Sequence, residues 1–96
     1  MSLALLVNDK DNVATVFAEN VGEGAGVLLV DKTGGRRQIV AACPVPYGHK
    51  IALFPIKKGE TVYKYGESIG FASADIAAGG HVHIHNMESA RGRGDL

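Results

Sequence analysis

The sequence predicts an all-β domain, and three observations support this. Short runs of apolar and β-branched residues recur along the 96 residues, and no window carries a helical period. Glycine is frequent, at 13 residues, and polar turn-forming residues separate the runs. Three segments share the frame Ile/Val-x-x-Gly-x-x-Val, which is typical of a tight turn that leads into a strand. A chain of this length suits one domain with a modest core.

The first half of the chain alternates between strand patterns and polar turns. The apolar run Leu3–Val7 predicts a first strand, and the Asx-rich segment 8–12 predicts a turn into a second strand. Either the alternate residues from Val13 or those from Ala14 form the core face of that second strand. The other expected elements of this half are a strand at 27–30, a hairpin turn at 33–35 and a return strand at 36–41.

The second half begins with a loop and continues with the repeated turns. Pro44 and Pro46 predict an extended loop, and His49–Phe54 predicts a strand that Pro55 ends. In each repeat an apolar anchor enters the turn, glycine supplies a positive φ, and a β-branched residue starts the next strand. The three copies are 21–27, 56–62 and 76–82.

Three of the four histidines lie at every second position in residues 79–86. Alternate residues of a strand share a face, so we expect His81, His83 and His85 on one face and Val82 and Ile84 in a core. Residues two apart lie ~7 Å apart and residues four apart ~13 Å, whereas a metal–imidazole bond is ~2.1 Å. Two neighbouring histidines can therefore share one metal ion, but His81 and His85 cannot. The alternative is an exposed edge strand with surface histidines.

Two further polar segments are candidates for chemistry. His49 and Lys50 follow a Pro-Tyr-Gly loop and could present a base and a cation to an anion. Lys64 and Tyr65, in the segment 64–67, could bind an oxyanion or transfer a proton. For both segments the alternative is a turn with solvated polar residues.

Composition limits the partners and the compartment. The net charge is zero with histidine neutral, so no nucleic acid is expected. Cys43 stands alone, which excludes an internal disulfide and favours a reduced, cytoplasmic setting with a buried, inert thiol. The apolar start is too short for a secretion signal, and no stretch is long enough to span a membrane. Residues 87–96 predict a flexible tail, in which Arg-Gly-Asp is expected to be a chance triplet.

Three motifs in order resemble a known family. They are Tyr-Gly-His-Lys-Ile-Ala-Leu at 47–53, Lys-Tyr-Gly-Glu-Ser-Ile-Gly at 64–70 and His-Val-His-Ile-His-Asn at 81–86. They resemble the small subunit, or N-terminal domain, of the altronate and galactarate dehydratases, and the alpha subunit of sulfolactate sulfo-lyase is similar. The resemblance implies a SAF-type β-clip domain at 1–86, followed by the tail at 87–96. One departure is Gly80, where an acidic residue is expected in many relatives.

The resemblance also implies a function. It implies β-elimination of water from a sugar acid, in which a base removes the proton next to the carboxylate and a divalent metal, Fe²⁺ or Mn²⁺, stabilises the enediolate. It implies a large partner subunit that supplies much of the active site. The site residues expected on this basis are His49 and Lys50 for catalysis, Lys64 and Tyr65 for substrate binding, and His81, His83 and His85 for the metal.

Three alternatives stay open. The chain could be a sulfolactate sulfo-lyase alpha subunit, from which sulfite leaves instead of water. It could be a module that binds sugar acids or metal without catalysis. It could also be a structural domain whose histidines are incidental. Self-association into a homo-oligomer is compatible with each of them.

Overall fold

The computed structural model describes residues 2–89, and over that range the chain forms nine strands and no helix. This confirms the all-β class. No helix in this part of the chain is long and apolar enough to cross a membrane. The strands are β1 (Ser2–Leu6), β2 (Val13–Val16), β3 (Gly26–Asp31), β4 (Arg36–Val40), β5 (Lys50–Ala52), β6 (Thr61–Lys64), β7 (Glu67–Ala72), β8 (His81–Val82) and β9 (Met87–Ser89).

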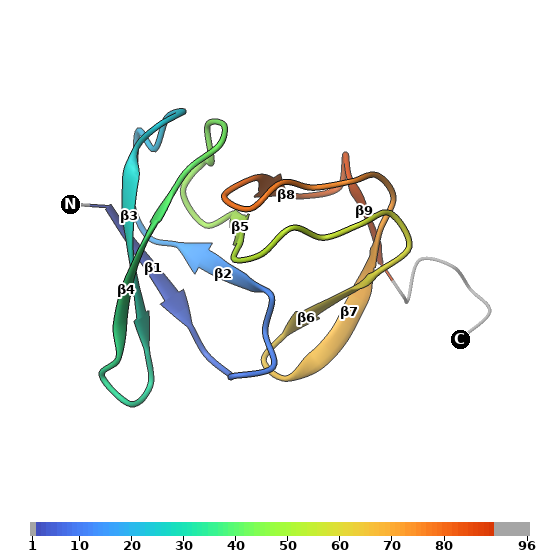
Figure 1. The fold of residues 1–96 in the computed structure, drawn as a ribbon, viewed down its shortest axis with the longest axis horizontal. Helices are drawn as coiled ribbons and strands as arrows, with labels where there is room; N and C mark the ends of the chain where they lie inside the picture. Colours follow the sequence, from blue (N-terminus) through green and yellow to red (C-terminus); the bar gives the residue numbers. More distant parts are fainter. Residues whose placement is uncertain (1, 90–96) are drawn as a thin grey trace.

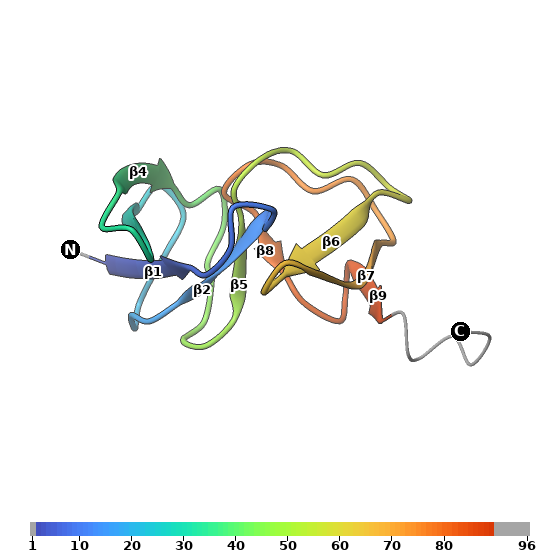
Figure 2. The same ribbon diagram turned by 90° about the horizontal axis from the view of Figure 1, so that it is seen from below.

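The strands form two sheets. A six-stranded sheet has the order β4-β3-β1-β2-β5-β8, and a three-stranded sheet has the order β6-β7-β9. Within the larger sheet only the pairing of β1 with β3 is parallel. Figures 1 and 2 show β1–β4 at one end of the molecule, β6, β7 and β9 at the other, and β5 and β8 between them. The smaller sheet therefore lies beside the β5–β8 end of the larger one.

Strand β2 contributes to two separate hydrophobic cores. Ala14 and Val16 are buried in the first core, with residues of β1, β3 and β5. Val13 is buried in the second core, which β6, β7 and β8 also line. The two alternative core faces of this strand are thus both used, and only Phe17, just past its end, is exposed. A strand between two cores needs apolar residues on both faces, which explains why alternation did not decide between them.

Within residues 2–89 the repeated turn occurs four times, not three. The glycines at positions 24, 48, 59 and 79 all have φ between 81° and 91°. In each copy the residue after the glycine donates its N–H to the carbonyl three residues earlier, as His49 does to Pro46. The anchors bridge in pairs, Val21 with Val45 and Ile56 with Ile76. The fourth copy, 45–51, does not match the sequence frame because it ends in Ile51 where the other copies have Val.

A buried carboxylate connects the two ends of the fold. Asp11, in the turn between β1 and β2, is 2% exposed. It accepts hydrogen bonds from the N–H groups of Asn8, Tyr65 and Gly66. Tyr65 and Gly66 form the tight turn between β6 and β7, both with positive φ. The Asx-rich turn predicted at 8–12 is therefore confirmed. The Asp11 side chain of this turn also holds the β6–β7 turn in place.

The expected histidine strand is wrong beyond Val82. Strand β8 ends there, and residues 83–86 form a turn. The amide of Asn86 closes this turn: it accepts from the N–H of His83 at 2.9 Å and donates to the carbonyl of His81 at 2.7 Å. Ile84, expected in a core, is 83% exposed as a result.

The domain also extends past the boundary predicted at Asn86. Met87–Ser89 forms β9, which pairs antiparallel with β7 from Gly70 to Ala72. These three residues therefore belong to the fold and not to a tail. Residues 90–96, including the Arg-Gly-Asp triplet, lie outside the described range.

The repeated turns give a testable difference between two glycines. A Cβ at Gly59 would meet no atom within 4 Å, whereas a Cβ at Gly79 would run into the carbonyl oxygen of Val40. Because both have positive φ, we expect Gly59→Ala to lower the free energy of unfolding by about 1–2 kcal/mol. Gly79→Ala should cost clearly more, since β4 must also move. Urea denaturation of both variants measures this, and equal losses would contradict the packing of the turn against β4.

Candidate metal centre

The pairing of β5 with β8 brings three histidines together. Ile51 lies opposite His81 and Lys50 opposite Val82 in this antiparallel pair. Continuing the register by one residue places His49, just before β5, opposite His83, just after β8. The rings of His49 and His83 stack with centroids 4.0 Å apart. Residues 32 and 34 positions apart in the sequence thus meet on one face.

The imidazole nitrogens of His49, His81 and His83 converge. One ring nitrogen from each lies within 4.8 Å of the others. Nδ1 of His49 and Nε2 of His81 are 2.8 Å apart, so one donates a hydrogen bond to the other. Nitrogens bound at ~2.1 Å to one ion lie ~3.0 Å apart in octahedral and ~3.4 Å apart in tetrahedral coordination. Because the nitrogens are separated by up to 4.8 Å, the three rings must move closer together, by roughly 1–2 Å at the widest pair, to share one ion.

The fourth histidine lies at the edge of this group. His85 is exposed in the turn after β8, with its ring centroid 5.0 Å from that of His81. It is not one of the three whose nitrogens converge. The expectation that His81 and His85 lie ~13 Å apart is wrong, because the turn closed by Asn86 folds His85 back toward His81.

The environment keeps two of these imidazoles neutral. Partial burial lowers the pKa of His81 from 6.5 to about 4, and its histidine neighbours add to the effect. Burial, together with the charges of His49 and Lys50, also lowers the pKa of His83. A metal ion binds neutral imidazole, so these shifts reduce proton competition for the ligand nitrogens.

The other predicted site residues divide into two groups. Lys50 lies near His83, where its charge acts on that imidazole. Lys64 and Tyr65 lie instead at the β6–β7 turn beside Asp11, next to the β1–β2 turn and away from β8 (Figure 1). Lys64 is buried, with Nζ 3.6 Å from the centroid of the Tyr65 ring. The structure therefore brings His49 to the histidine group, whereas the Lys50 side chain lies on the other face of β5 and acts on His83 only through its charge, and Lys64 and Tyr65 lie elsewhere.

Two residues near the histidines were not singled out as site residues. Asn86 shapes the turn that positions His83, because its side chain bonds the backbone N–H three residues earlier, a local pattern that Asn favours. Cys43 is partly exposed, not buried as expected, and its Sγ accepts the N–H of His81 at 3.3 Å. Gly80, where a carboxylate was expected in relatives, has no room for a side chain: a Cβ would lie 2.8 Å from the carbonyl oxygen of Ala77.

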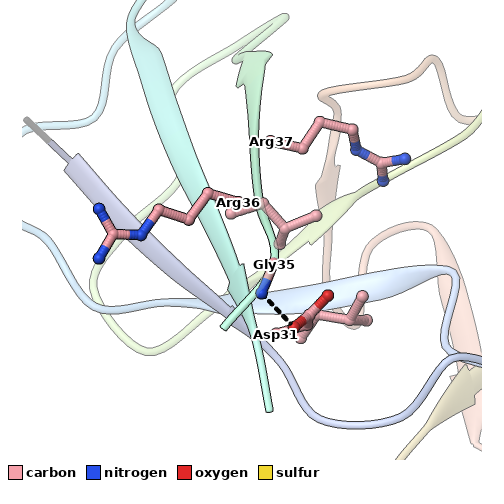
Figure 3. A pocket seen from close by; sticks show the side chains of 6 residues that line it. Asp31, Gly35, Arg36 and Arg37 are labelled. Atoms are coloured by element: carbon pink, nitrogen blue, oxygen red, sulfur yellow. Dashed lines mark hydrogen bonds between the residues drawn. The ribbon is translucent and has the colours of Figure 1, made fainter. Parts of the chain in front are cut away.

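A cavity elsewhere does not form a comparable site. It measures about 210 Å³ and lies at the β3–β4 hairpin. Figure 3 shows the guanidinium groups of Arg36 and Arg37 pointing apart, so they do not converge on one anion. The carboxylate of Asp31 accepts from Thr33 and Gly35 in the hairpin turn. The hydrogen bond from the Thr33 side chain, with those of the turn backbone, lowers the pKa of that carboxyl.

Comparison with known proteins identifies the family. Residues 2–90 match the family model described as the altronate/galactarate dehydratase SAF domain. The chain belongs to this family. It is 51% identical over 79 residues to altronate dehydratase of Escherichia coli strain K12, with 82% of this chain aligned to 15% of that protein. It is 35% identical over 96 residues to (2R)-sulfolactate sulfo-lyase subunit alpha of Chromohalobacter salexigens, covering 95% of this chain and 99% of that subunit.

The relatives differ in how much lies beyond the SAF domain. Galactarate dehydratase (L-threo-forming) of Escherichia coli is 38% identical over 73 residues, which is only 13% of its length. The chain thus spans a small part of the two dehydratases but nearly the whole of the sulfo-lyase subunit alpha. The SAF domain therefore occurs both as part of a longer chain and as a subunit of its own length.

The lowered pKa of His81 predicts how stability depends on pH. Unfolded His81 binds a proton near pH 6.5, but folded His81 does so only near pH 4. Between these values the unfolded state binds more protons, so the free energy of unfolding should fall as pH is lowered from 6.5 to 4. Urea denaturation of metal-free protein across this range measures the fall.

The matched variant is His81→Asn, which removes the titrating imidazole. The free energy of unfolding should then fall less between pH 6.5 and 4 than in the wild type. His83 acts in the same direction, so the fall should be smaller still in His81→Asn/His83→Asn. Asp31, whose pKa is lowered from 3.8, contributes only below this range. An unchanged slope in both variants would contradict the assignment.

Proposed function

We propose that this chain is the small SAF subunit or domain of a hydro-lyase of the altronate/galactarate type. It acts with a large partner subunit to eliminate water from a sugar acid, and His49, His81 and His83 hold a divalent metal, Fe²⁺ or Mn²⁺. The observation that carries the proposal is the convergence of three imidazole nitrogens within 4.8 Å in a domain of this family. The 51% identity to altronate dehydratase supports the hydro-lyase reaction.

A sulfo-lyase alpha subunit is the second candidate. It is supported by the match over 99% of the length of (2R)-sulfolactate sulfo-lyase subunit alpha. The two reactions share the first requirement, which is removal of a proton next to a carboxylate. They differ in the group that leaves, which is hydroxide in one and sulfite in the other.

The residues of this chain bind, orient and transfer protons in the proposed reaction. Imidazole suits first-row metals such as Fe and Mn when water or carboxylate completes the shell. When bound, such an ion supplies Lewis acidity that stabilises an enediolate. The ammonium of Lys50, close to His83, attracts the substrate carboxylate.

The geometry assigns different tasks to the first and last histidines. His49 turns Nδ1 toward His81, so in this proposal it is a ligand and not the base first expected. His85 is exposed beside His81 and outside the convergent set. It can therefore accept or donate a proton at a bound substrate.

The site requires a partner because it is incomplete. The convergent group in residues 2–89 contains three imidazoles and no carboxylate. An ion with six positions would keep three for substrate, water or partner groups. His85 is open to solvent and His49, His81 and His83 are only partly buried, so this domain alone does not exclude water from the reaction.

The metal proposal predicts distinct effects for two neighbouring histidines. His83→Ala should lower the affinity for Fe²⁺ or Mn²⁺ on the order of 100-fold, because it removes one of three ligands. His85→Ala, two residues away, should change it little. Anaerobic calorimetric titration with each metal measures both, and circular dichroism checks that the variants fold. Equal affinities in the two variants would place the metal elsewhere.

The partner proposal predicts that activity appears only in a complex. The purified chain should not turn over aldonates, aldarates or sulfolactate, because few acid–base groups converge on it. Mixed with a large subunit that matches the remainder of altronate dehydratase, it should dehydrate a sugar acid. Loss of water measured on aldonates and aldarates, against sulfite release from sulfolactate, separates the two candidates. Rapid turnover by the chain alone would contradict the proposal.

A further inference from the structure

One face of the larger sheet is apolar and exposed at its β4-β3-β1 end. Paired residues of neighbouring strands point to the same side of a sheet. Ala4, Val27 and Leu29 point into the first core, so their neighbours in the chain point outward. The second sheet packs over the outward face only around Val13, Ala52 and Val82. The outward apolar residues beyond this cover are Leu3, Leu5, Val40 and Phe17, which are exposed, and Leu28 and Val30, which are half-buried.

This uncovered face extends to the turn that carries His49. The N–H of Phe17 bonds to the carbonyl of Leu3, which extends the β1–β2 pairing by one residue. Phe17 therefore points to the same side of the sheet as Leu3. Its ring contacts Tyr47 edge to face, with centroids 6.2 Å apart. Tyr47 lies two residues before His49, in a turn that two backbone hydrogen bonds fix to Val16. A partner on this face would therefore also contact the turn that leads into β5.

The charges on the face are of one sign. Arg36 pairs with Val30 and Lys50 pairs with Thr15 on the outward side. Gln38 pairs with Leu28, and no acidic residue occupies an outward position of the paired residues of β1 to β5. A protein that fits this face would present apolar side chains bordered by carboxylates.

The same charges disfavour a second copy of this chain as the occupant. A two-fold dimer apposes the same patch on both subunits. Arg36 and Lys50 of each copy would then approach those of the other without an acidic counterpart on the face. Like charges at an interface cost several kcal/mol.

We propose that the face formed by Leu3, Leu5, Phe17, Leu28 and Val30 docks the large subunit, through an apolar patch of that subunit edged with acidic residues. The inference rests on the proposed function, which requires such a subunit. Docking here covers an apolar sheet face that a free domain leaves in water. It also holds the large subunit against Tyr47, in the turn that precedes His49.

The test compares two glutamate substitutions of exposed apolar residues. Leu5→Glu places a charge in the centre of the face. Phe54→Glu is the control, because Phe54 is exposed but lies away from the proposed face. Its ring lies 5.5 Å from the guanidinium of Arg37, and Arg37 points to the opposite side of β4 from the outward residue Arg36. The probe is the large polypeptide from the same genome that matches the part of altronate dehydratase beyond this domain. Biolayer interferometry measures its dissociation constant with the full chain.

We expect Leu5→Glu to weaken binding on the order of 100-fold and Phe54→Glu to leave it within about threefold, because central apolar contacts dominate interface energies. Metal affinity should stay unchanged in Leu5→Glu. Arg36→Glu should slow association most at low salt. Circular dichroism and thermal unfolding show whether each variant folds.

The outcomes separate this inference from the proposed function. Turnover by the wild-type complex with normal binding of Leu5→Glu would overturn the docking face and leave the function standing. Binding that depends on Leu5, without turnover of any aldonate, aldarate or sulfolactate, would overturn the function and leave the docking face standing. Self-association of the chain that Leu5→Glu abolishes would assign the face to a homodimer and overturn the inference.

Discussion

The antiparallel pairing of β5 with β8 is the contact on which the rest of the structure depends. It closes the larger sheet with a strand from the end of the chain and lines the boundary between the two cores. Its register places His49 opposite His83 and His81 opposite Ile51. A slip of one residue would turn the histidines to the other face of the strand and bring Val82 out of the second core. The same register thus fixes both the packing and the candidate metal centre.

The histidine group combines rigidity on one side with openness on the other. Backbone pairing and the Asn86 amide hold His81 and His83, and partial burial keeps their imidazoles neutral. His85 is exposed at the open side. This asymmetry suits a metal centre whose ligands come from this domain and whose open side is covered by a second protein, as in the proposed function. It agrees with a family in which this domain is joined to a long chain in some relatives and has the length of a separate subunit in another.

The uncovered sheet face follows from the limited extent of the second sheet. Among residues 2–89, only the three strands of the second sheet pack over the outward face of the larger sheet, and they cover one end of it. The centre of this face consists of leucine, valine and phenylalanine, and the polar side chains of Arg36, Gln38 and Lys50 lie at its border. In the proposed function, the large subunit covers this face and completes the set of reactive groups.

The sequence by itself determined the all-β class, most strand positions and the glycine turns, because period-two patterning and positive-φ glycines are local properties. It also brought out the histidines and the family. Only the tertiary structure decided which imidazoles meet. The turn at Asn86 ends β8 early and folds His85 back, and the β5–β8 register adds His49 to the group. Local patterns cannot specify a pairing between residues more than 30 positions apart, because that pairing is set by how two cores pack around the shared strands.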